Sequence, residues 1–173
     1  TEKKYAAAHA AFKNNIEKLE PNSTDKENCA YYLALSALKL NKKEAPTLLD
    51  DFEKKHPTSP LKNSLFLAVG NHYHKQRKAT TSLKWLQKVN PQYLTKKQKE
   101  AYHFKMGYAL LSNKKFTEAK TYFLPLTRSK IYETEANYYY GYLSYIQKDD
   151  DTAQKYFQKL TGNKRYQKEI LYF

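Results

Sequence analysis

The sequence repeats at an interval of 34 residues in its C-terminal half. Two windows, 101–126 and 135–160, align without a gap. The positions that agree between them are Gly107 with Gly141, Ala119 with Ala153, Phe123 with Phe157, and Leu126 with Leu160. A fixed period of this length is typical of repeat architectures, in which each unit buries its apolar face against the next. The chain is therefore expected to fold as a stacked array.

The glycine of each window lies inside a segment that otherwise favours helix. A glycine within a helix costs up to about 1 kcal/mol relative to alanine, so it needs a packing reason. We predict that it lets a second helix approach closely. Ala119 and Ala153 are expected to face the glycine from that helix, and Phe123 and Phe157 to continue the same apolar stripe.

Weaker copies precede the two windows. In the nearest copy, Gly70 stands at the position of the glycine and Ser82 at that of the alanine. Leu86 stands at the position of the phenylalanine, and Val89 at that of the last leucine. The step from Gly70 to Gly107 is 37 residues, which predicts about three extra residues in the loop 90–95. Further upstream, Ala34 stands at the glycine place. Segment 1–21 resembles a second helix without its first, and 165–173 a first helix without its second, so we expect an array cut from a longer one.

The whole chain is predicted to be all-α, a right-handed solenoid of antiparallel helix hairpins in a single array of four to five units. The expected helices are 2–19, 25–40, 43–55, 61–76, 79–89, 96–112, 115–127, 131–147, 150–160 and 165–172. The expected units are a partial repeat 1–21, then 25–57, 61–91, 96–128 and 131–161, and a partial helix 165–173. Pro125 is expected to kink or shorten its helix.

The positive net charge of the chain bears on whether its partner is a nucleic acid. The net charge is +14, carried by 28 lysines and only three arginines. A basic balance suggests nucleic acid or another anionic surface. Specific phosphate and base readout, however, usually relies on the planar fork of arginine. Because the lysines are spread along the chain, we favour a solvated lysine-rich surface, with nucleic-acid binding as the alternative.

The spacing of small and aromatic residues resembles the tetratricopeptide repeat. The shared pattern is glycine, alanine twelve residues later, an aromatic residue four further on, and a closing apolar residue. The resemblance is strong over 101–160 and looser over 1–57. The chain departs from the family pattern in lacking the early tryptophan of each first helix, where His103 and Asn137 stand instead.

A narrower likeness concerns the segment 52–60, in which Phe52 is followed by Pro57, Ser59 and Pro60, and then by a helix that contains Gly70. This segment is similar to the sequences of periplasmic tetratricopeptide proteins of Gram-negative bacteria, including proteins of outer-membrane assembly and of the Tol-Pal system. The resemblance implies a location in the periplasm or at the outer membrane, with the cytoplasm as the alternative.

In the tetratricopeptide family, side chains of the first helices line a concave wall that binds protein partners. Carried over, the resemblance implies a partner-binding wall of Tyr31, Leu35, Asn71, His74, Phe104, Tyr108, Tyr138, Tyr142 and Tyr145, together with Leu38, Leu67 and Leu111. Tyrosine offers a large rigid contact area with one polar tip, which suits a peptide or a partner helix. The alternative is that these rings pack between adjacent repeats.

Some members of the family clamp the C-terminal carboxylate of a chaperone with lysine and asparagine side chains. Asn71 and Lys75 match two places of that clamp, but Leu67 occupies the place of its first lysine. The clamp is therefore incomplete. The function that we expect is a protein-interaction scaffold, and the accessory region of a larger enzyme is a further alternative.

Other candidate sites are weak. His72 and His74 are two residues apart, so they point to different faces of a helix and do not form a metal pair. The run Asp149–Asp151 lacks the glycine and the closing glutamate of a calcium loop. We interpret it as a turn whose negative charge is favourable at the N-terminus of the next helix. The single cysteine, Cys29, is expected in the core. With no catalytic motif in the sequence, we expect neither an enzyme nor a cofactor or metal.

Overall fold

The computed structural model describes residues 2–170, and this part of the chain contains α- and 3-10 helices but no strand. The α-helices are α1 (Glu2–Asn15), α2 (Thr24–Lys39), α3 (Ala45–Lys55), α4 (Lys62–Lys75), α5 (Ala79–Leu86), α6 (Lys96–Ser112), α7 (Phe116–Phe123), α8 (Glu133–Ile146), α9 (Asp150–Gln158) and α10 (Gln167–Ile170). Short 3-10 helices span Ile16–Lys18, Pro91–Tyr93 and Leu124–Arg128. The all-α prediction is confirmed.

Most helices begin and end within three residues of their predicted positions. The first helix is an exception, because α1 stops at Asn15 and continues as a 3-10 turn to Lys18. Pro125 shortens α7 as expected: the helix ends at Phe123 and passes into the 3-10 helix Leu124–Arg128. The predicted last helix, 165–172, is α10 over Gln167–Ile170, and residues 171–173 lie outside the described part.

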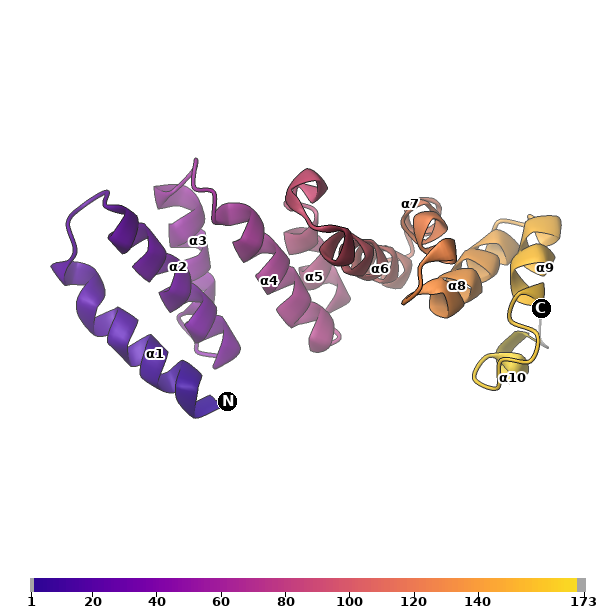
Figure 1. Cartoon of the computed structure of the whole chain (residues 1–173), viewed down its shortest axis with the longest axis horizontal. Helices are drawn as coiled ribbons and strands as arrows, with labels where there is room; N and C mark the ends of the chain where they lie inside the picture. Colours follow the sequence, from indigo (N-terminus) through magenta and orange to yellow (C-terminus); the bar gives the residue numbers. More distant parts are fainter. Residues whose placement is uncertain (1, 171–173) are drawn as a thin grey trace.

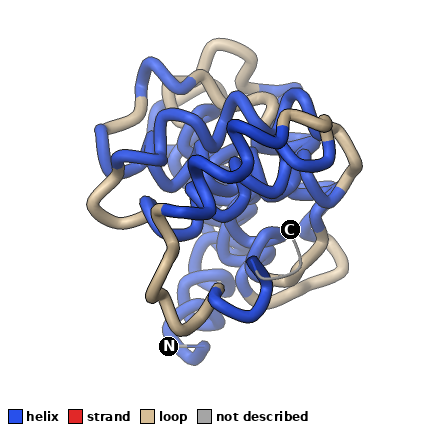
Figure 2. The backbone as a smooth tube through the Cα atoms, turned by 90° about the vertical axis from the view of Figure 1, so that its right-hand side faces the viewer, coloured by secondary structure: helices blue, strands red, loops and turns tan. Residues whose placement is uncertain are grey.

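The helices follow one another along the long axis of the molecule, with α1 and α10 at opposite ends (Figure 1). Consecutive helices pack as hairpins, α2 with α3, α4 with α5, α6 with α7 and α8 with α9. The hairpin α2–α3 packs on the next one through α2 with α4, and the later hairpins pack on one another through α5 with α6 and α7 with α8. The view turned by 90° shows these helices overlapping in projection, joined by loops (Figure 2). The result is a solenoid rather than a globule around one centre.

The turn inside each hairpin uses one left-handed residue at a constant place. Asn41, Arg77, Lys114 and Lys148 all have φ between 52° and 60°, and each lies seven residues after Ala34 or its glycine counterpart. The residue that follows donates a backbone hydrogen bond to a carbonyl five residues earlier, for example from Lys115 N to Leu110 O at 2.9 Å. This is the Schellman geometry, which satisfies carbonyls at the end of a helix.

The repeated glycines bring paired helices together. An ideal Cβ placed on Gly107 would lie 2.8 Å from Phe123 Cζ, and one on Gly141 would lie 2.8 Å from Phe157 Cε1. The close approach is as predicted, but the side chain that faces the glycine is the phenylalanine. Ala119 and Ala153 are buried nearby and leave room for the ring. The prediction that the alanines face the glycine was therefore only partly right.

The loop before each first helix is tied to the preceding first helix by a polar contact. Ser129 Oγ donates to Glu100 Oε2 at 2.8 Å, and Ser59 Oγ makes the equivalent bond to Glu27. In both loops the serine oxygen also accepts a backbone N–H two residues later. These contacts hold the hairpins at a fixed offset and complement the apolar packing between them.

Candidate partner-binding face

Four first helices, α2, α4, α6 and α8, carry the side chains predicted to bind a partner. We call the first-helix face the set of these side chains that stay at least partly exposed. It consists of Leu35, Leu67, Asn71, His74, Phe104, Tyr108, Leu111, Tyr138, Tyr142 and Tyr145. Tyr145 is the most open of its large apolar residues, with 43% exposure.

Two predicted members lie elsewhere. Tyr31 is only 9% exposed and Leu38 only 3%. The ring of Tyr31 meets the ring of Phe52 on the paired helix α3 edge-on, with centroids 5.9 Å apart. Both residues therefore belong to the core of the first complete hairpin, and we remove them from the candidate surface.

The aromatic side chains of the face also connect one repeat to the next. His74 on α4 meets Tyr108 on α6 edge-on, with ring centroids 5.5 Å apart. Phe104 stacks on Tyr132, at 5.0 Å, in the turn before α8. The two alternatives left open by the sequence, partner contact and packing between repeats, are thus not exclusive. Each of these rings contacts the neighbouring unit and keeps part of its surface exposed.

Tyr139, which is not among the predicted members of the face, lies at the centre of the aromatic contacts. Its ring stacks on Phe123 at 5.0 Å and also meets Phe104 and Tyr108. Burial, with Tyr166 and other nearby tyrosines, raises the pKa of Tyr139 to about 12. The residue stays neutral at physiological pH and is a packing residue between α6 and α8.

The C-terminal end of the face is partly covered. Tyr138 stacks on Tyr166, which precedes α10, with ring centroids 4.5 Å apart. It also lies parallel to Tyr142 at 6.4 Å. A cavity of about 640 Å³ opens beside this end, lined by Tyr145, Phe157 and Ile170 among others.

Lys105, which is also not among the predicted members of the face, lies next to Asn71. Lys105 Nζ on α6 donates a hydrogen bond to Asn71 Oδ1 on α4 at 2.7 Å. Lys105 stands 34 residues before Tyr139, so the repeat interval marks the two positions as equivalent. The structure shows that both are partly buried.

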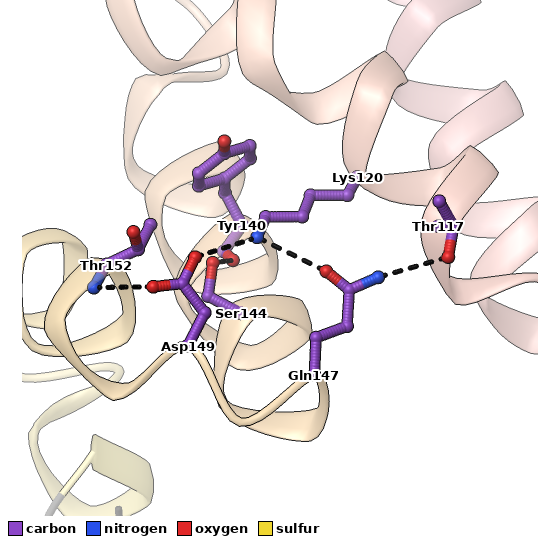
Figure 3. A network of polar contacts seen from close by, with 7 residues as sticks. All are labelled: Thr117, Lys120, Tyr140, Ser144, Gln147, Asp149 and Thr152. Atoms are coloured by element: carbon purple, nitrogen blue, oxygen red, sulfur yellow. Dashed lines mark hydrogen bonds and ion pairs between the residues drawn. The ribbon is translucent and has the colours of Figure 1, made fainter.

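A second polar network lies between α7 and the turn that joins α8 to α9 (Figure 3). Lys120 Nζ lies 3.4 Å from Asp149 Oδ2, 3.2 Å from Gln147 Oε1 and 5.1 Å from the centre of the Tyr140 ring. Gln147 in turn donates to Thr117 Oγ1 at 3.2 Å. These contacts join α7 of one repeat to the α8–α9 turn of the next.

The acidic run and the histidines have local partners. Asp149 Oδ1 accepts from Thr152 N at the start of α9, as expected for a helix N-terminus. Hydrogen bonding with the Thr152 side chain first, and then with the Thr152 backbone and Lys120, lowers the pKa of Asp149. His72 Nε2 contacts Gln76 Nε2 at 2.8 Å. Within residues 2–170 no cluster of three metal-binding side chains occurs, and no helix has the length and apolarity to span a membrane. Cys29 is buried, and its thiol contacts Phe12 O at 3.4 Å.

Two solved structures of MamA, a tetratricopeptide-repeat protein, have the same arrangement of helices. A double mutant of MamA from RS-1 superposes with a TM-score of 0.60 at 15% identity, over 94% of this chain and 88% of that one. MamA from AMB-1 gives a TM-score of 0.57 at 18% identity, over 92% and 94%. No protein-family model and no curated protein matches the sequence. The 34-residue period, the hairpin geometry and these two structures together establish the fold, and the chain is an all-helical superhelix of the tetratricopeptide type.

Proposed function

We propose that the chain is a protein-interaction scaffold that binds a peptide or a protein partner along the first-helix face. One observation carries the proposal: a row of large side chains runs over α2, α4, α6 and α8 and keeps part of its surface exposed. Stacked hairpins present such rows as extended binding surfaces. Half-buried aromatic rings are held by their neighbours, so they lose little conformational entropy when a partner binds.

A location in the bacterial cell envelope belongs to the same proposal and rests on the likeness of segment 52–60 to periplasmic tetratricopeptide proteins. Fractionation of cells that express the gene from its own start codon would test this location. Recovery of the protein in the cytoplasmic fraction would contradict it.

Site-specific photo-crosslinking tests the binding face. A benzophenone amino acid at position 142 on α8 is expected to crosslink a protein partner in living cells. The matched control is position 155, an exposed lysine on α9 that lies outside the face. Crosslinks of equal yield from both positions would contradict the assignment.

A double variant tests the same face without a chemical probe. Tyr108→Ala with Tyr142→Ala is expected to reduce recovery of the crosslinked partner in a pull-down by tenfold or more, about 1.4 kcal/mol or more, because aromatic anchors dominate interface energies. Tyr93→Ala serves as the control, since Tyr93 is 76% exposed in the loop before α6. Unchanged capture by the double variant would refute the proposed face.

A further inference from the structure

Two exposed apolar side chains lie in the loops between hairpins. Tyr93 precedes α6 and is 76% exposed, and Ile131 precedes α8 and is 58% exposed. Both loops adjoin the start of α6: the first leads into it, and Ser129 in the second donates to Glu100 Oε2 at 2.8 Å. Ser129 Oγ also accepts the backbone N–H of Ile131. Single exposed apolar residues are common on protein surfaces, so their surroundings decide what these two do.

The surroundings of these loops are cationic. Five exposed side chains carry the charge: Lys96, Lys97, Lys99, Arg128 and Lys130. None of the five forms an ion pair within residues 2–170. Segments 88–99 and 119–132 contain no acidic residue. Of the two acids that follow these segments, Glu100 is bonded to Ser129 and Glu133 is exposed. We call the five cations together with Tyr93 and Ile131 the inter-hairpin edge.

The stability of α6 does not explain the lysines at its start. The first turns of α2 and α8 each carry two acidic residues, whereas the first turn of α6 carries none. Acidic side chains stabilise a helix N-terminus, and cations oppose its partial positive charge. Three lysines within four residues also repel one another. An anionic surface placed against the inter-hairpin edge would offset both unfavourable interactions.

We propose that the inter-hairpin edge binds the surface of a membrane that contains anionic phospholipids. The cations contact headgroup phosphates, since lysine and arginine near an anionic bilayer are attracted to it. Tyr93 and Ile131 enter the interfacial layer, where an aromatic ring with a polar tip is favoured and an aliphatic side chain leaves water. This inference goes beyond the proposed function, because the edge shares no residue with the first-helix face and leaves that face free for a protein.

A nucleic acid fits the inter-hairpin edge less well than a lipid surface. Its phosphates could meet the same cations, and a base could stack on the ring of Tyr93. Neither contact uses Ile131, which is aliphatic and open to water. Four of the five cations are lysines, which lack the planar fork that reads bases. A bilayer surface accepts both the charges and the aliphatic side chain.

Vesicle sedimentation tests the inference. The probes are vesicles of phosphatidylcholine alone and vesicles of phosphatidylcholine with phosphatidylglycerol at about 7:3, in about 100 mM sodium chloride. We expect the full chain to partition at least about tenfold more strongly to the anionic vesicles. The triple variant with Lys96, Lys97 and Lys99 changed to glutamine should lose about tenfold or more of that binding. Equal partitioning of the wild-type chain to both kinds of vesicle would overturn the inference.

A matched triple variant separates this edge from general charge. Lys114, Lys148 and Lys155 are exposed lysines outside the edge, and the length of α6 places Lys114 about 25 Å from its first turn. Their change to glutamine removes the same charge and should alter binding to anionic vesicles by less than about twofold. Equal losses from the two triple variants would show that overall charge is responsible, and the inference would be wrong.

The apolar contribution has its own test. Tyr93→Ser with Ile131→Ser keeps every charge and should weaken binding to anionic vesicles by about fivefold or more. In Tyr93→Trp, anionic vesicles should shift the added fluorescence to shorter wavelength, while the buried Trp85 of the wild-type chain should show no shift. Unchanged binding by the double serine variant would contradict the inference. So would an oligothymidine that binds more tightly than the anionic vesicles and depends on the same three lysines.

Discussion

At the scale of single residues, the hairpin turns carry a conformational cost. Lys114 and Lys148 adopt φ of 60°, a left-handed conformation that costs a residue with a Cβ about 1 kcal/mol or more and costs glycine nothing. The equivalent turn before α3 uses Asn41, which tolerates this conformation better. Sequence patterns located these turns as polar segments, but lysine at the left-handed position gives no local signal of its conformation.

Lys114→Gly is therefore expected to stabilise the protein by about 0.5–1 kcal/mol, because relief of the left-handed strain exceeds the greater flexibility of glycine in the unfolded chain. Urea denaturation followed by circular dichroism measures the change. Lys115→Gly is the control. Because Lys115 lies outside the left-handed region, this substitution should destabilise the protein. A lower midpoint for Lys114→Gly would show that the turn is not strained.

Three histidines make stability depend on pH. Burial, and secondarily nearby lysines, lowers the pKa of His72, His74 and His103. The folded state therefore binds fewer protons than the unfolded state once the pH falls toward the ordinary histidine pKa of about 6.5. Stability from these groups is complete above that value and is lost as the pH falls through it.

We expect the urea midpoint to decrease between about pH 7.5 and about pH 5.5. His74→Gln combined with His103→Gln should flatten this dependence, because glutamine does not titrate. A wild-type midpoint that stays level or rises over this interval would contradict the assignment.

At the scale of helices, the contact between the two helices of a hairpin depends on glycine. Phe123 is fully buried and its ring end occupies the space where a Cβ on Gly107 would lie, 2.8 Å away. The sequence predicted a close approach from the cost of a helical glycine. It did not show which residue faces the glycine, because that depends on how the two helices cross.

Gly107→Ala is expected to destabilise the protein by about 1–3 kcal/mol, since overpacking a buried ring outweighs the better helix propensity of alanine. Gly107→Ala with Phe123→Leu should be more stable than the sum of the two single variants, because leucine leaves room for the methyl group. Simple additivity in chemical denaturation would show that the ring does not fill this space.

At the scale of the whole molecule, a net charge of +14 is spread over an extended solenoid. Mutual repulsion of like charges destabilises the folded chain, and salt screens it over about 10 Å at 0.1 M. The thermal midpoint should rise when sodium chloride is increased from about 20 mM to about 200 mM.

A variant with Lys96, Lys97 and Lys99 changed to glutamate should respond less to salt, because it has lower net charge and favourable acidic residues at the start of α6. A midpoint that falls with added salt in the wild-type protein would mean that attractive ion pairs, and not repulsion, dominate its electrostatics.

The sequence by itself determined the repeat interval, the all-helical class and the places of Gly70, Gly107 and Gly141. These features follow from periodicity and from local propensity, which the order of residues along the chain contains. Only the tertiary structure decided that Tyr31 is buried, that Tyr139 joins two repeats and that Lys105 meets Asn71. Tyr31 is buried within one hairpin, whereas Tyr139 and Lys105 contact neighbouring hairpins. The geometry of all three contacts depends on helix crossing angles and loop lengths, which fix how helices pair and how one hairpin stacks on the next.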